Sequence, residues 1–97
     1  MQVNISAQNI DITPALREYT ENKLERVKSH LDTITSIHIV FKVEKHQQIA
    51  EGQVHCPPKH TLHATGESET MYKSIDLLMD RLVRQITKHK EKMTDHR

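Results

Sequence analysis

The chain has 97 residues, of which 35% are hydrophobic and 3% aromatic, and its formal charge is only +1. A chain this short forms one domain, here residues 1–97 with a flexible tail of about five residues, and its small aliphatic core leaves little room for a deep substrate cavity. One cysteine excludes an internal disulfide framework, and the absence of a secretory leader or a membrane-length apolar run predicts a cytoplasmic location away from membranes.

The first half of the chain predicts a strand, a helix and a second strand. Apolar and polar residues alternate over residues 2 to 7, which is the period of a strand with one wet face. Thr13 then precedes Pro14, a pair typical of a helix N-cap and its first helical residue. Apolar residues recur at helical spacing from there to residue 31, and a turn at residues 32 to 36 separates this helix from a strand over residues 37 to 44.

The second half predicts two more strands and a long helix. Alternation continues over residues 50 to 56 and 61 to 65, with Pro57, Pro58 and Lys59 as the connection. Thr70 is placed to cap a helix over about residues 70 to 92 with one apolar face. The order β-α-β-β-β-α predicts an α+β fold with two helices packed on one face of a four-stranded, mostly antiparallel sheet.

The other face of this sheet is expected to meet solvent. Its predicted residues are His38, Val40, Lys42, Gln53, His55, Thr61, His63 and Thr65. None of them is Phe, Tyr or Trp, the residues on which the bases of single-stranded RNA stack. The face is therefore a poor platform for single-stranded RNA.

Positive charge is concentrated at the C-terminal end. Residues 81 to 97 contain six Lys and Arg against two acidic residues, whereas residues 1 to 80 contain eight against eleven. At about 100° per residue, the second helix places five cations on an arc opposite its apolar stripe, with Asp76, Asp80 and Glu91 to one side. These five are Lys73, Arg81, Arg84, Lys88 and Lys92.

The first helix carries a weaker basic arc of Lys23, Arg26 and His30 beside Tyr19. If both arcs turn toward a common groove, six to eight cations form one strip suited to a folded nucleic acid backbone. Two amphipathic helices with ordinary solvated faces are the alternative that the pattern leaves open.

Metal chemistry and catalysis have little support. His55, Cys56, His60 and His63 resemble a zinc site, but residues one or three apart on a strand point to opposite faces, so we expect no metal and no cofactor. Cys56 falls at an inward position, where an inert thiol is usual. Two glycines form no phosphate-binding loop, and Asp76 and Asp80 are best explained as solvated charges, so we expect no enzyme.

Several segments carry a resemblance to a known family. Residues 69 to 76 read Glu-Thr-Met-Tyr-Lys-Ser-Ile-Asp, Leu-Val-Arg-Gln follows at 82 to 85 and Lys-His-Lys at 88 to 90, and the first helix opens with Thr-Pro-Ala-Leu-Arg at 13 to 17. Together they resemble the short members of the ribosome hibernation factors, the family of ribosome-associated inhibitors and sigma-54 modulation proteins. The family pattern reads Asp-Met-Tyr-Ala-Ala-Ile-Asp, so that Thr70 replaces an acid and Lys73-Ser74 two alanines; threonine caps a helix as aspartate does.

The resemblance implies a double-stranded-RNA-binding-like fold and a role in the stress response. Such a protein occupies the decoding region of the small ribosomal subunit, blocks mRNA and tRNA and so inhibits translation. The short form favours inactive ribosome dimers and acts with a separate ribosome modulation factor.

The residues expected to contact 16S-type rRNA lie on the two helices. They are Tyr19, Lys23, Arg26, His30, Lys73, Arg81, Arg84, Lys88, Lys90 and Lys92. Tyr72 is either a further contact or a core residue. If six or more phosphate contacts form, affinity should fall about a thousandfold between 50 and 200 mM salt.

A second function, that of a protein-interaction module, remains an alternative. The basic helix also suits a protein-interaction module that docks an acidic partner such as a sigma factor. RNA-independent capture of a protein would favour that function, whereas cosedimentation with ribosomes that is lost on reversing Arg84 and Lys88 would favour the first. A metal enzyme is a distant third, tested by zinc content.

Overall fold

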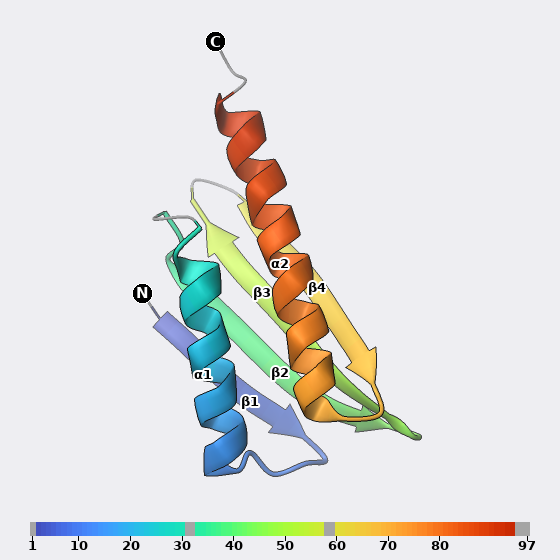
Figure 1. The fold of residues 1–97 in the computed structure, drawn as a ribbon. Coiled ribbons are helices and arrows are strands. Elements are labelled where there is room, and N and C mark those ends of the chain that lie inside the picture. The colour runs from blue at the N-terminus through green and yellow to red at the C-terminus, as the bar shows by residue number, and fades with distance from the viewer. Residues whose placement is uncertain (1, 31–32, 58–59, 95–97) are drawn as a thin grey trace.

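The computed structural model describes residues 2–30, 33–57 and 60–94, excepting the side chains of 92–94. Its elements follow the predicted order β-α-β-β-β-α (Figure 1). They are β1 (Gln2–Gln8), α1 (Pro14–Lys28), β2 (Ser36–Glu44), β3 (Gln47–Cys56), β4 (His60–Ser68) and α2 (Met71–Thr94). The prediction that the first helix continues to residue 31 is wrong, because α1 ends at Lys28 with Ser29 as its C-cap. Turn residue Asp32, link residues Pro58 and Lys59, and the tail at 95–97 lie outside the described residues.

Some boundaries differ from the sequence-based expectation. β3 begins at Gln47 rather than at residue 50, and β4 continues to Ser68 rather than to residue 65. β3 starts earlier because a two-residue turn at Lys45 and His46 joins it to β2 and aligns Glu44 opposite Gln47. β4 continues further because Ser68 pairs with Gln48 of the lengthened β3. Backbone pairing in both strand pairs therefore continues past the point where hydrophobic alternation stops.

The sheet has the order β1-β2-β3-β4. β2, β3 and β4 pair antiparallel, while β1 pairs parallel with β2 and places Ile5 opposite Ile39. A parallel pair needs a crossover connection, and α1 supplies it between β1 and β2. The prediction of a mostly antiparallel four-stranded sheet is confirmed.

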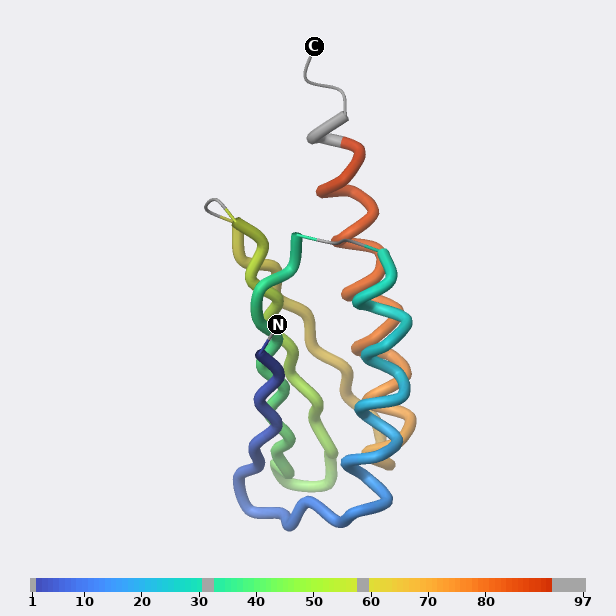
Figure 2. Tube along the Cα trace, turned by 90° about the vertical axis from the view of Figure 1, so that its left-hand side faces the viewer, coloured from blue at the N-terminus to red at the C-terminus, as the bar shows by residue number. Residues whose placement is uncertain are grey.

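Both helices lie on one face of the sheet and run in the same direction (Figures 1 and 2). Between the layers lies an aliphatic core with one phenylalanine, and burial of each large side chain contributes about 1.5–3 kcal/mol. Its most buried members are Leu24, Val27, Ile37, Ile39, Phe41, Val54, Ile75, Leu78, Met79, Leu82 and Ile86. α2 contributes five of these residues, so its apolar stripe is the main support of the core.

The starts of both helices follow from their capping residues. The Thr13 hydroxyl accepts a hydrogen bond from the Leu16 amide at 3.1 Å, and Pro14 occupies the first helical position. The Thr70 hydroxyl accepts from the Lys73 amide at 3.3 Å. Both predicted N-caps are therefore confirmed.

α2 is tied to the sheet where it approaches β4 most closely. A Cβ placed on Gly66 would lie 2.8 Å from the Leu78 nitrogen and closer still to the Ser74 carbonyl oxygen. The buried Ser74 hydroxyl donates to the Gln48 carbonyl of β3 at 2.6 Å. These contacts fix the height and the rotation of α2 over the sheet.

The opposite face of the sheet meets solvent, as predicted. His38, Gln53, His55, Thr61 and His63 are exposed on it, and Val40, Lys42 and Thr65 are half-buried. An ion pair of 3.2 Å joins Lys42 Nζ to Glu51 Oε2 on this face.

Replacing Gly66 tests the close approach of α2 to the sheet. Gly66→Ala should lower the free energy of unfolding by about 1–3 kcal/mol, because the added methyl group meets helix backbone that cannot move aside. Gly52→Ala is the matched control, because the three atoms nearest to its methyl group are side-chain ends, those of Leu78, Leu82 and Ile39 at 3.0, 3.1 and 3.4 Å. Urea denaturation of both variants measures the difference, and equal losses would contradict this account.

Candidate nucleic-acid interface

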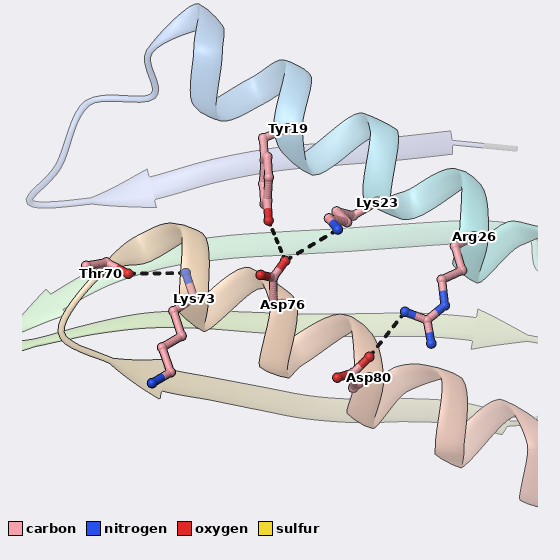
Figure 3. Close-up of polar contacts among 7 residues, drawn as sticks. All are labelled: Tyr19, Lys23, Arg26, Thr70, Lys73, Asp76 and Asp80. Atoms are coloured by element: carbon pink, nitrogen blue, oxygen red, sulfur yellow. Dashed lines mark hydrogen bonds and ion pairs between the residues drawn. The ribbon is translucent and has the colours of Figure 1, made fainter.

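Three predicted site residues on α1 point toward α2. Tyr19 Oη donates a hydrogen bond to Asp76 Oδ1 at 2.6 Å, and Lys23 Nζ lies 3.7 Å from the same oxygen (Figure 3). One turn further along both helices, Arg26 Nη1 donates to Asp80 Oδ1 at 3.2 Å. We call these five residues the interhelical cluster.

The interhelical cluster corrects two expectations. The predicted uninterrupted strip of cations is wrong, because Lys23 and Arg26 are ion-paired with Asp76 and Asp80. The prediction that both aspartates are merely solvated is wrong for the same reason, although their side chains remain 48% and 55% exposed. Helical periodicity separates acidic from basic residues on one helix, but it does not show which side of that helix faces its neighbour.

Two tyrosines extend the cluster toward the start of α2. The rings of Tyr19 and Tyr72 meet edge to face with centroids 4.9 Å apart, and Lys23 Nζ lies 5.3 Å from the Tyr19 centroid. Tyr72 is 44% exposed, so it is a surface residue rather than a core residue. Its ring is held in place by Tyr19 and is still accessible.

The remaining cations of α2 form a separate surface, which we call the α2 crest: Lys73, Arg81, Arg84 and Lys88. All four are exposed. Across the described residues, none of them forms an ion pair with a carboxylate. Arg81 donates to the Thr65 carbonyl of β4, and the Lys73 side chain points away from α1 (Figure 3). The crest runs over 16 residues, from Lys73 to Lys88, which is about 22 Å of helix, with its charge available to a ligand.

The other predicted site residues lie at the ends of the helices. His30 is half-buried just beyond α1, and Lys90 is exposed on α2. The side chain of Lys92 lies outside the described residues. The structure therefore groups seven of the ten predicted residues into the interhelical cluster and the α2 crest.

The histidine and cysteine cluster divides between the two faces of the sheet. His55 and His63 are on the open face, whereas Cys56 is buried toward the helices and His60 faces α2. Within residues 2–30, 33–57 and 60–94, no group of three or more potential ligands could hold a metal ion. Burial raises the pKa of the Cys56 thiol, which keeps it protonated and unreactive.

Sequence reasoning missed three functional features: the acceptor role of Asp76 and Asp80, the tie from Ser74, and the burial of His89. A signal for the first was present. Asp76 and Asp80 are four residues apart, and Lys23 and Arg26 three, so two parallel helices can align Lys23 with Asp76 and Arg26 with Asp80. His89 also had a signal, because it lies three residues after Ile86 and seven after Leu82, on the apolar stripe of α2. Ser74 lies at the edge of that stripe, where the pattern does not decide between burial and exposure.

Comparison with known proteins identifies the family. The family model described as "Sigma 54 modulation protein / S30EA ribosomal protein" matches residues 3–94. A ribosome hibernation promoting factor from Pseudomonas putida is 49% identical over 92 residues, 95% of this chain and 89% of the relative. One from Klebsiella oxytoca is 43% identical over 96 residues, 99% of this chain and 100% of the relative.

A solved structure agrees with these relatives. The ribosomal subunit interface protein from Coxiella burnetii has a TM-score of 0.88 and 43% identity, covering 94% of this chain and 99% of that one. The chain belongs to the ribosome hibernation factor family, which confirms the resemblance seen in the sequence. Because the family consists of non-enzymatic ribosome-binding proteins, the expectation that the chain is no enzyme is also confirmed.

Neither helix of the described chain is both long enough and apolar enough to span a membrane.

The hydrogen bond from Tyr19 to Asp76 predicts an altered titration. The bond, together with desolvation and the charge of Asp76, raises the pKa of Tyr19 above its ordinary value. A raised folded-state pKa means that the stabilisation is complete below about pH 10 and is lost as pH rises through the folded value. In a Tyr72→Phe background, where Tyr19 is the only tyrosine, ultraviolet titration should show this shift, and Asp76→Asn should reduce it. Identical curves with and without Asp76 would contradict the assignment.

Proposed function

We propose that the protein acts in ribosome hibernation by binding rRNA in the decoding region of the small ribosomal subunit. The observation that carries this proposal is the α2 crest, whose four cations face solvent without carboxylate partners in the described chain. Family membership supplies the ribosome as the target, and unpaired cations along one helix supply the means of binding phosphates.

The interhelical cluster has a different role in this proposal. Its cations are partly neutralised, so it contributes less to phosphate attraction than the crest does. Its carboxylates accept hydrogen bonds, which suits ribose 2′-hydroxyls or base amino groups. The exposed ring of Tyr72 lies beside it and is available for stacking on an unpaired base. In this proposal the α2 crest attracts phosphates, and the interhelical cluster with Tyr72 recognises riboses and bases.

Binding at the decoding region would silence translation by occlusion. The protein would occupy the paths of mRNA and of the tRNA anticodon ends, so no reaction is required. A short factor of this kind would promote inactive ribosome dimers together with a separate ribosome modulation factor. Its site of action would be the cytoplasm, where ribosomes work.

Salt dependence tests how many phosphates are contacted. The four crest cations predict a loss of affinity on the order of a hundredfold between 50 and 200 mM salt, rather than the thousandfold expected for six or more contacts. Fluorescence anisotropy of labelled protein titrated with small subunits measures the slope. A tenfold loss or less would contradict phosphate binding by the crest, and a thousandfold loss would show that the interhelical cations also engage phosphates.

Charge reversal tests where the ribosome binds. Arg84→Glu should weaken binding to small subunits at least tenfold, because it removes one phosphate contact and adds a repulsive charge on the crest. Lys45→Glu is the matched control, since it changes the net charge equally at the exposed β2–β3 turn. Cosedimentation through sucrose gradients measures both variants, and mRNA with tRNA should displace the wild-type protein. Equal weakening in both variants would contradict a crest-centred interface. Capture of a protein in the absence of RNA would favour the sigma-factor alternative.

A further inference from the structure

A cavity of about 230 Å³ lies between the beginning of β4 and the C-terminal half of α2. It is lined by His60, Leu62, Gln85, Lys88 and His89, and no acidic residue is among these lining residues. β4 lies on the side of α2 that faces away from α1 (Figure 1), so the cavity lies on that side and shares Lys88 with the crest. The function proposed above makes no use of it.

His89 is the unusual residue of this cavity. Its side chain is on a polar helix segment but is buried, with 7% of the residue exposed. Its Nε2 atom is buried and has no hydrogen-bond partner among the described residues. Leaving such a group unpaired costs about 1–3 kcal/mol, so a partner from outside the chain is the simplest reason for its placement.

The neighbouring side chains supply further hydrogen-bond donors. The His60 ring lies against His89 with centroids 4.7 Å apart and an interplanar angle of 64°. His60 is exposed at the first residue of β4, so its ring can turn aside and admit a ligand to His89. Lys88 forms no ion pair in the described part of the chain. The Gln85 side-chain amide already donates a hydrogen bond to the His63 carbonyl, so we do not count it among the donors to a ligand.

We propose that this cavity binds one phosphate group, held by Lys88 Nζ and by the imidazole N–H groups of His60 and His89. An ammonium and two imidazoles without a carboxylate favour an oxyanion and oppose a metal cation. Because Lys88 belongs to both the cavity and the α2 crest, a backbone phosphate of RNA lying along the crest would reach the cavity. This source of the phosphate rests on the proposed function, whereas the cavity's affinity for phosphate does not.

Nuclear magnetic resonance of the full chain tests the site directly. Titration with inorganic phosphate, against sodium chloride of equal ionic strength, should shift the imidazole signals of His60 and His89 together and saturably. His38 on the open sheet face is the internal control and should not shift. A short RNA oligonucleotide in place of phosphate should move the same two signals. Absence of a saturable shift with both probes would overturn the proposal.

Ribosome binding distinguishes the two sources of phosphate. His60→Ala, at an exposed position, should keep the fold and weaken binding to small subunits about tenfold, the effect of losing one charge-assisted hydrogen bond. His89→Asn is a second variant, checked for folding by circular dichroism, and should weaken phosphate binding similarly. If phosphate shifts the signals while His60→Ala binds small subunits normally, the site takes free phosphate and the RNA source is overturned. If the wild-type protein binds phosphate but no ribosome, the proposed function fails and the cavity's phosphate site stands.

Discussion

The rotation of α2 about its own axis is the constraint on which the rest of the surface depends. The apolar stripe from Ile75 to Ile86 is buried against the sheet, and the close approach at Gly66 leaves no room for the helix to roll. The Ser74 bond to Gln48 sets its position along the strands. Once this rotation is fixed, each polar residue of α2 can face only α1, solvent or β4.

That rotation separates opposite charges onto different sides of one helix. Asp76 and Asp80 face α1 and pair with Lys23 and Arg26, while the crest cations face solvent or β4. Exposed ion pairs contribute only about 0–1 kcal/mol each, so the interhelical cluster adds little to stability compared with the apolar stripe. Its main consequence is geometric: it holds two cations and a tyrosine between the helices and leaves the crest as the one concentrated field of unpaired positive charge in the described chain.

Local sequence signals predicted most of the fold. Thr13-Pro14 and Thr70 marked the helix starts through capping chemistry, and alternation marked the strands wherever one face was buried. The strand ends at Gln47 and Ser68 could not be predicted, because there the ladder is held by backbone pairing rather than by a buried side-chain face.

The candidate site was only partly predictable, for a different physical reason. Periodicity places Asp76 and Lys73 on different arcs of α2, but only tertiary packing determines which arc meets α1. The exposure of Tyr72 and the burial of His89 depend on the same packing. Residue types and their helical positions were therefore sufficient to indicate nucleic acid binding, whereas the division into a neutralised cluster and an unpaired crest required the structure.

Lysine footprinting on the ribosome tests directly whether the α2 crest is the surface that binds rRNA. The free protein and its ribosome complex are treated with formaldehyde and a borohydride reductant, and methylation of each lysine is quantified by mass spectrometry. If the α2 crest binds the ribosome, Lys73 and Lys88 become protected in the complex while Lys45 at the exposed β2–β3 turn reacts as before. Protection of Lys45 with unchanged reactivity at Lys73 and Lys88 would show that another face binds the ribosome and would contradict the account.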